Sequence, residues 1–214
     1  MISAELIMSD NCEFDFSDVD CDFQTKFAKF YKVHNNDGNT SIIKVFKKEY
    51  CDFFSEHKYN LLKNIRSELM ISILSINNKI NNQYVEYEYF ESMTLKEWLH
   101  SDCIITKSLL INVIKDMAEI IDKFHQNDLV HLDIVGNFLI NTDGKIKLND
   151  YDYVEELGGS KKGRVDLHSF FELVYRMILF VHKKKSTRTI NIKFNDTNID
   201  HSSCKKFISS LDLQ

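Results

Sequence analysis

Apolar and β-forming residues cluster into two strand pairs within the first ninety residues. Residues 26–35 and 40–47 flank Asn-Asn-Asp-Gly, a strong turn signal, and so predict an antiparallel hairpin. Residues 68–76 and 83–90 predict a second pair, joined by an asparagine-rich segment. Between the pairs, residues 48–66 carry apolar side chains at roughly helical spacing. This part of the chain therefore predicts a small sheet with one helix.

The pattern becomes mainly helical after about residue 92. Three segments have helical periodicity: a short amphipathic one at 94–100, a long one at 108–126 with one apolar face, and a strongly apolar one at 165–182. Residues 138–141 and 145–149 predict two short strands around the turn Thr-Asp-Gly-Lys. We therefore expect a second, largely helical region that contains one tight hairpin.

Composition and charge limit the classes of function. The 214 residues, 43% of them hydrophobic, can bury a core in one domain or in two apposed lobes. The net charge of -5 comes from 27 basic and 32 acidic residues without a long block of either sign, so no nucleic-acid-binding surface is predicted. No segment has transmembrane length, and the acidic N-terminus does not resemble a signal peptide. We therefore expect a cytoplasmic protein.

The five cysteines are scattered and form no Cys-x-x-Cys pair. This pattern indicates neither a zinc site nor a disulfide framework. It is typical of a protein from a reducing compartment, which agrees with the expected location.

One short stretch carries the polar residues that phosphoryl transfer requires. Asp133 follows His131 by two positions, Asn137 comes four residues later, and Asp150 follows the predicted strand 145–149. Phosphoryl transfer uses a metal held by carboxylate and amide oxygens, and a carboxylate that orients the attacking hydroxyl. This order of residues resembles the catalytic loop and metal-binding motif of the protein kinase superfamily. The flanking helices follow in that family's order.

The resemblance implies a role for each of these residues. Asp133 would orient the substrate hydroxyl and accept its proton, while Asn137 and Asp150 would hold magnesium against the phosphates of ATP. Lys44 lies mid-strand among apolar neighbours and matches the family's third-strand lysine, which contacts those phosphates. A solvated lysine on an edge strand is the alternative. Asp166 matches the acid that bonds to the catalytic-loop backbone, and it can also be interpreted as an ordinary acid at a helix N-terminus; the two interpretations are compatible.

The resemblance also implies partners in the first half of the chain. Lys44 would pair with a glutamate, for which Glu56 is the first choice and Glu49 and Glu68 are alternatives. Residues 86–99 resemble the segment that joins the two kinase lobes. The backbone of Glu88, Tyr89 and Phe90 would then meet the adenine edge of ATP.

The chain departs from the kinase pattern around the phosphates. No glycine-rich segment precedes Lys44, so phosphate cradling by loop amides is not predicted. The interval from Asp133 to Asn137 is one residue shorter than in most kinases and lacks the loop lysine of protein kinases. A missing charge there would slow transfer or accompany a different substrate.

Further departures follow the motif. Leu132 stands where kinases have an arginine that pairs with an activation-segment phosphate, so switching by that route is not expected. Asp152 replaces a glycine, and its charge would help to hold metal or would alter the loop. Only fifteen residues separate Asp150 from Asp166, which leaves no platform for a protein substrate.

The sequence therefore predicts an α+β fold: a bilobal protein-kinase-like fold with a small β-rich N-lobe and a truncated, mainly helical C-lobe. The expected division is an N-terminal segment at 1–25, the N-lobe at 26–91, the C-lobe at 92–182 and a tail at 183–214. The predicted activity is that of a minimal serine/threonine protein kinase that uses ATP and Mg²⁺. A lipopolysaccharide-core or other small-molecule kinase and a pseudokinase binding module are the alternatives.

The expected partners are ATP and an unidentified protein acceptor, with no nucleic acid and no membrane span. If the chain is an exported effector or a viral protein, it would act in a host cytosol on a host or partner protein.

Overall fold

The computed structural model of this chain has a mixed α+β fold, as the sequence predicts. The structure describes residues 16, 20–34, 38–79, 82–158, 160–184, 192–193, 204 and 212–213. The chain divides into two compact units, Met1–Arg66 with Ile71–Phe90 and Ser67–Met70 with Glu91–Gln214. We call them the first unit and the second unit. The fourfold division expected from the sequence stays a prediction.

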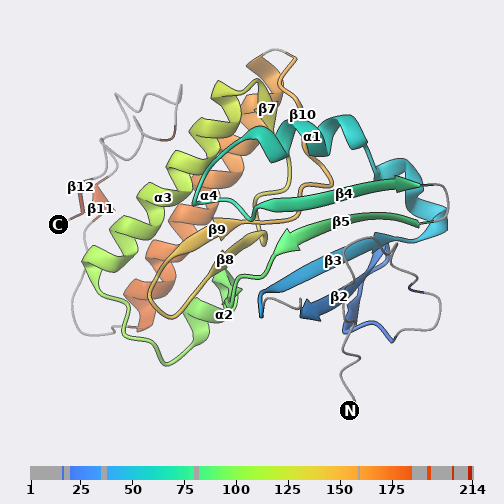
Figure 1. Cartoon of the computed structure of the whole chain (residues 1–214). Helices are drawn as coiled ribbons and strands as arrows, with labels where there is room; N and C mark the ends of the chain where they lie inside the picture. Colours follow the sequence, from blue (N-terminus) through green and yellow to red (C-terminus); the bar gives the residue numbers. More distant parts are fainter. Residues whose placement is uncertain are drawn as a thin grey trace. The chain divides into compact units, whose positions relative to one another are not determined.

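The first unit contains a five-stranded antiparallel sheet (Figure 1). Its strands are β1 (Phe23–Gln24), β2 (Ala28–His34), β3 (Thr40–Phe46), β4 (Ile73–Lys79) and β5 (Asn82–Glu88). Their spatial order is β1-β2-β3-β5-β4. The predicted hairpin around Asn-Asn-Asp-Gly is confirmed by the pairing of β2 with β3, which places Phe30 opposite Lys44.

The second predicted strand pair begins and turns at different residues. β4 starts at Ile73 instead of residue 68, and it runs on through Asn77 and Asn78, which the sequence suggested as a linker. β4 is one of the two edge strands of the sheet, so polar side chains at its exposed end can face water. Met70 belongs to the second unit, where it forms a bridge with Leu148.

The helix predicted over 48–66 is two helices. A 3₁₀ helix, η1 (Lys48–Phe53), precedes α1 (Glu56–Asn64). Ser55 separates them: its backbone is extended, and its side chain accepts a hydrogen bond from the N–H of Lys58, as a helix N-cap does.

The two faces of the first sheet are covered by different residues. Tyr59 of α1 packs on Phe46, with ring centroids 6.2 Å apart, so α1 covers the face of β3 that carries Phe46. Side chains alternate along a strand, so Lys44 lies on this same face. The opposite face holds a buried cluster of Phe16, Tyr31, Val33 and Ile43. The sheet is therefore apolar on both sides, and Lys44 sits on its helical side.

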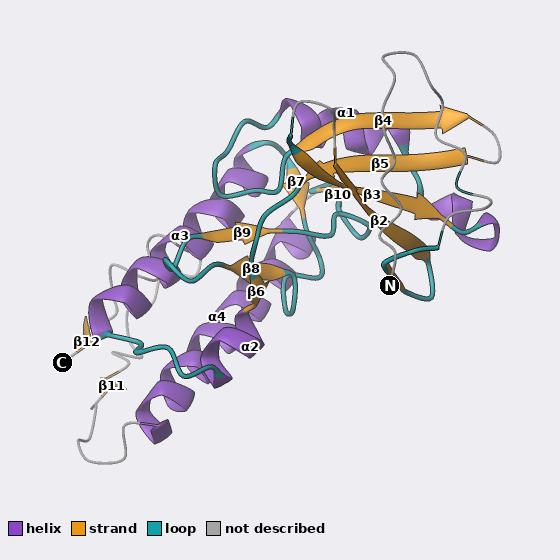
Figure 2. Cartoon of the chain, turned by 60° about the horizontal axis from the view of Figure 1, so that its bottom comes forward, coloured by secondary structure: helices purple, strands orange, loops and turns teal. Residues whose placement is uncertain are grey.

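In the part of the chain that the structure describes, the second unit joins three small sheets to three helices. Its elements are β6 (Met93–Thr94), α2 (Leu95–His100), α3 (Lys107–Gln126), β7 (Leu129–Val130), β8 (Phe138–Ile140), β9 (Ile146–Leu148), β10 (Glu155–Glu156), α4 (Ser160–Lys184), β11 (Ile192–Lys193) and β12 (Asp212–Leu213). The three helices and the hairpin of β8 and β9 confirm the predictions from the apolar pattern. α3 and α4 run side by side (Figure 2).

The start of α4 differs from the prediction. The helix begins at Ser160, whereas the apolar pattern starts near residue 165. Gly163 lies where α4 approaches the preceding segment, because a Cβ atom there would be 3.1 Å from Cδ1 of Leu157. Asp166 is consequently the seventh residue of the helix, and the interpretation of it as an acid at the helix N-terminus is wrong.

Candidate active site

His131 lies between β7 and the loop that carries Asp133, and only 1% of its surface is exposed. Its Nε2 is 3.1 Å from the carbonyl oxygen of Asn149, and its Nδ1 accepts a hydrogen bond from the N–H of Asp133. These partners fit a neutral ring with its proton on Nε2. Burial lowers the pKa of His131, although the nearby Asp166 acts in the opposite direction. The neutral ring of His131 thus bonds to two backbone segments, at Asn149 and at Asp133.

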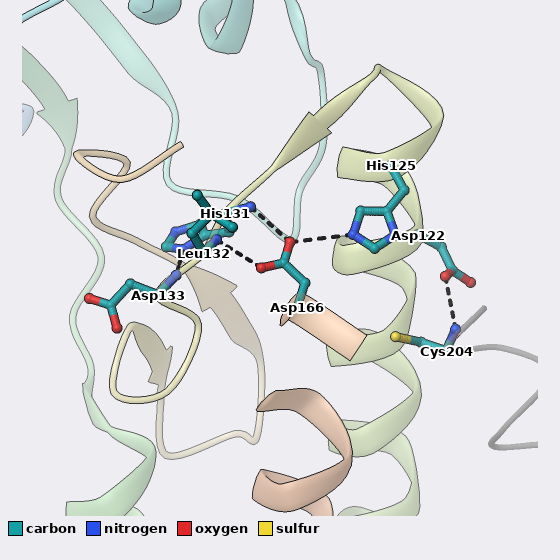
Figure 3. A network of polar contacts seen from close by, with 7 residues as sticks. All are labelled: Asp122, His125, His131, Leu132, Asp133, Asp166 and Cys204. Carbon is teal, nitrogen blue, oxygen red and sulfur yellow. Dashed lines mark hydrogen bonds and ion pairs between the residues drawn. The ribbon is translucent and has the colours of Figure 1, made fainter. Parts of the chain in front are cut away.

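Asp166 holds the backbone that leads to Asp133. Its two carboxylate oxygens accept hydrogen bonds from the N–H groups of His131 and Leu132, each at 2.8 Å (Figure 3). Leu132 has a φ of 65°, a left-handed conformation that is unfavourable for a leucine. The buried carboxylate therefore stabilises a strained turn, and this is the contact that the resemblance implies for Asp166.

Asn137 fixes the side chain of Asp133. Its Nδ2 donates to the Asp133 carbonyl oxygen at 2.6 Å and to the Asp133 carboxylate at 3.1 Å. Both bonds use the amide nitrogen, so the amide oxygen of Asn137 is the atom that remains to bind a cation. The shortened loop turns at Gly136, whose φ of 109° would strain any other residue.

Asp150 follows Asn149, which forms a backbone hydrogen bond with this loop. The N–H of Asn149 donates to the carbonyl oxygen of Asn137 at 2.8 Å, so the turn after β9 runs next to the catalytic loop. Asp150 itself has a φ of 56°, a second left-handed non-glycine residue in this small region. Such conformations occur often at functional sites. The structure thus brings Asp133, Asn137 and Asp150 into one region of the second unit.

The two expected metal ligands have suitable chemistry for magnesium. Mg²⁺ binds carboxylate and amide oxygens and usually completes its coordination with water and phosphate oxygens. Among the described residues, no group of three or more His, Cys, Asp or Glu side chains is placed to hold a metal ion. A magnesium ion on Asn137 and Asp150 would therefore depend on the nucleotide for further ligands. Asp152, the alternative ligand, is 8% exposed.

Lys44 is a buried cation in the first unit. It lies on β3, between β2 and β5, and is 3% exposed, so the alternative of a solvated edge-strand lysine is wrong. Its ammonium is 5.3 Å from the ring centroid of Phe46 and 5.6 Å from that of Phe30. A lysine held in such apolar surroundings is favourable only if its charge is compensated. Its contact with ATP stays a prediction.

The expected glutamate, Glu56, has another partner in the structure, and its pairing with Lys44 stays a prediction. Glu56 is the first residue of α1 and is exposed, and its Oε2 accepts a hydrogen bond from Asn78 at 2.8 Å. The alternatives Glu49 and Glu68 are both exposed.

Glu88, in the segment expected to meet adenine, already forms two hydrogen bonds with the backbone of Ser72. The N–H of Glu88 donates to the carbonyl oxygen of Ser72, and its carboxylate accepts from the N–H of Ser72. The N–H of Glu88 is therefore not the group that would meet an adenine edge. Tyr89 is 38% exposed and has the ammonium of Lys32 4.0 Å from its ring centroid, whereas Phe90 ends the first unit. Adenine binding by this segment stays a prediction.

Reasoning from the sequence missed two contacts made by residues of α3. His125 places Nε2 3.3 Å from the carboxylate of Asp166 (Figure 3). Asp122, one turn earlier on α3, accepts a hydrogen bond from the N–H of Cys204 at 3.0 Å and is 7% exposed. The only sequence signal was an acid within an apolar helix, since no local spacing connects residues 122 and 204.

No described helix is long and apolar enough to cross a membrane. The expected cytoplasmic location stays a prediction.

Comparison with known proteins agrees with this geometry. The family model for the protein kinase domain matches residues 24–175. The chain is 30% identical to serine/threonine-protein kinase PrkC of Bacillus subtilis (strain 168) over 92 residues, which is 42% of this chain and 14% of that protein. It is 24% identical to serine/threonine-protein kinase pakG of Dictyostelium discoideum over 150 residues, 68% of this chain and 13% of that protein.

A third relative is serine/threonine-protein kinase PknB of Mycobacterium tuberculosis, 27% identical over 78 residues, or 36% of this chain and 12% of that protein. The chain thus matches only a small part of the length of these relatives. The kinase-domain match includes Asp133, Asn137 and Asp150 as well as Asp166. This chain belongs to the protein kinase domain family.

Proposed function

We propose that this chain is an ATP- and magnesium-dependent serine/threonine protein kinase. The observation that carries the proposal is the arrangement of Asp133, whose carboxylate is fixed by Asn137 and whose backbone is fixed through Asp166. Phosphoryl transfer depends mainly on positioning and on charge neutralisation. A loop held in this way can provide the positioning.

The proposed reaction assigns one task to each residue. Asp133 orients the acceptor hydroxyl, whose oxygen forms a bond to the γ-phosphorus while the bond to the β–γ bridging oxygen breaks and ADP leaves. The hydroxyl proton passes to Asp133. Lys44 would contact the phosphates of the nucleotide directly. Asn137 and Asp150 would hold magnesium, which neutralises charge on the phosphates when it is bound.

A small-molecule kinase is the second candidate, because one observation favours it. α4 begins at Ser160, ten residues after Asp150, so very little chain follows the metal-binding turn before the helix. Protein substrates need an extended surface, whereas a sugar or other small acceptor needs only a pocket.

The first test is a thermal unfolding titration with ATP, with and without magnesium. A ligand that binds only the folded chain must raise its stability, so we expect a magnesium-dependent rise in the unfolding temperature. Asp150→Ala should remove most of the magnesium dependence, and an unchanged magnesium effect would shift the metal site toward Asp152. No rise at millimolar ATP would contradict the proposal and favour a pseudokinase.

The second test separates the acceptor classes. Incubation with γ-labelled ATP should label the chain itself or a generic protein acceptor, and Asp133→Ala is the blank. Label that appears only on an added sugar would favour the small-molecule kinase.

A further inference from the structure

Asp122 is a buried acid on α3 that the reaction proposed above does not use. The structure describes all of α3, and the other buried residues of this helix are apolar. Asp122 is 7% exposed, and a buried carboxylate is costly unless hydrogen bonds satisfy its oxygens. Its Oδ1 accepts a hydrogen bond from the backbone N–H of Cys204 at 3.0 Å, 82 positions further along the chain. A residue that follows α4 in the chain therefore satisfies part of this acid.

Cys204 is fully buried and belongs to the second unit. Burial raises the pKa of its thiol, and the nearby Asp122 and Asp166 act in the same direction. A thiol in such surroundings stays protonated at neutral pH and is inert as a nucleophile. Cys204 thus contributes through its backbone N–H and its packing, at a position close to both acids.

His125 lies one turn after Asp122 on α3 and contacts the support of the catalytic loop. Residues three positions apart share a helix face, so an acid and a histidine at this spacing can pair. In the structure Nε2 of His125 lies 3.3 Å from Oδ2 of Asp166 (Figure 3). That same oxygen accepts a hydrogen bond from the N–H of His131 at 2.8 Å. Asp122 and Asp166 are therefore two buried acids that can compete for one histidine.

The N–H of Cys204 favours one outcome of this competition. With this N–H in place, Asp122 has a donor from outside α3, and His125 bonds to Asp166. Without it, Asp122 would draw water to the buried face or would take His125 from Asp166. The left-handed backbone of Leu132, with a φ of 65°, depends on the Asp166 carboxylate. The effect would therefore reach the catalytic loop.

We propose that Asp122 and the backbone N–H of Cys204 position the catalytic loop by keeping His125 bonded to Asp166. Both act through other residues, so they are positioning residues and not catalytic ones. The inference rests on the proposed function only for its effect on phosphate transfer, because the conformation of the loop can be measured without activity. It predicts that a residue beyond the kinase-domain match, which ends at residue 175, contributes to the rate.

The test is residue-resolved hydrogen exchange of the His131 and Leu132 amides in the full chain and its variants. Cys204→Pro removes the N–H and Asp122→Ala removes its acceptor, so each should speed the exchange of both amides about tenfold or more. Asp122→Asn keeps an acceptor oxygen and should restore most of the protection. Cys204→Ala keeps the N–H and should exchange at nearly the wild-type rate. Glu119→Ala, which removes an exposed acid one turn earlier on α3, is the control for charge.

Single-turnover kinetics at a series of ATP concentrations measure the consequence for phosphate transfer. The maximal rate should fall about tenfold in Cys204→Pro and in Asp122→Ala, whereas the ATP concentration that gives half of this rate should not change. The double variant should lose no more than either single variant, because both changes remove the same hydrogen bond.

The outcomes distinguish the inference from the function on which it rests. Unchanged exchange in both Cys204→Pro and Asp122→Ala would overturn the inference and leave the proposed function intact. Equal acceleration in Cys204→Ala would also overturn it, because packing of the thiol would then be the cause. A wild-type chain that transfers no phosphate, with the expected exchange in the variants, would overturn the proposed function and leave the support of the loop.

The amides of β3, in the first unit, report unfolding of the whole chain. If they exchange faster by the same factor in Cys204→Pro, the comparison of Asp122→Ala with Asp122→Asn takes its place. Faster exchange in Asp122→Ala that is confined to the loop and is restored in Asp122→Asn supports the inference. Equal exchange in these two variants overturns it.

Discussion

The catalytic loop of the second unit and the β1–β2 turn of the first unit are both tight, but different kinds of contact fix them. The loop around Asp133 is held by buried groups, His131 and Asp166, and includes a strained leucine at position 132. The β1–β2 turn is held by the hydroxyl of Thr25 and by Lys47. Buried networks tolerate little change, because each lost partner leaves an unsatisfied polar group. The loop should therefore be more sensitive to the loss of one partner than the turn.

Removing the carboxylate of Asp133 tests the function of the loop and should have the largest effect. We expect Asp133→Ala to reduce phosphate transfer about 10²- to 10⁴-fold while nucleotide affinity stays close to that of the wild type. Single-turnover rates and calorimetric titration with ATP measure the two quantities. Asp143→Ala, which changes an exposed aspartate in the β8–β9 turn, is the control. An equal loss of nucleotide affinity would contradict the role of Asp133 as base.

Removing Asp166 tests the support of the loop. In Asp166→Ala the N–H groups of His131 and Leu132 lose a buried side-chain acceptor, so the free energy of unfolding should fall by about 3 kcal/mol or more. Urea denaturation measures this change. Glu172→Ala, which breaks an exposed pair with Arg176 on the same helix, should change it by less than about 0.5 kcal/mol. Similar values for both variants would show that the buried contact contributes no more to the free energy of unfolding than the exposed pair does.

Removing the Thr25 hydroxyl tests the turn in the same way. Thr25→Val keeps the shape of the side chain but loses the acceptor of two backbone N–H groups, so we expect a loss of about 1–2 kcal/mol. Thr25→Ser should retain most of the stability. If Thr25→Val cost as much as Asp166→Ala, the two turns would not differ in the way described above.

The pH dependence of stability should show the smallest effect. Burial lowers the pKa of His131 below the ordinary value of 6.5, so the unfolded chain binds a proton more readily than the folded chain. The contribution of His131 to stability is complete above pH 6.5 and decreases as the pH falls below that value. His131→Gln should reduce this slope, whereas His168→Gln, at an exposed position on α4, should not. Unfolding free energies between pH 5 and 8 provide the measurement.

The sequence predicted most elements of both units because their apolar periodicity is local. The long helix α3 is an example: its apolar face is buried as expected, including Val113, Met117 and Phe124. The predictions failed where tertiary context decides. The asparagines of β4 are in a strand because that strand is at the sheet edge, and α4 extends upstream through residues without an apolar pattern.

The sequence predicted only part of the candidate site. The motif identified Asp133, Asn137 and Asp150, which the structure brings into one region. The pairing of Glu56 with Lys44 stays a prediction, and in the structure Glu56 accepts a hydrogen bond from Asn78. His125 could not be assigned, because its partner Asp166 is 41 positions away.

The bond from Asp166 to the backbone of His131 spans 35 positions in the chain. A fragment that ended shortly after Asp150 would contain every residue of the kinase motif but not the carboxylate that holds its strained turn. During synthesis, likewise, the loop can reach its final conformation only after the first two turns of α4 have left the ribosome. In this protein the presence of the motif is thus not sufficient for an assembled catalytic loop, and domain boundaries drawn for expression should lie beyond α4.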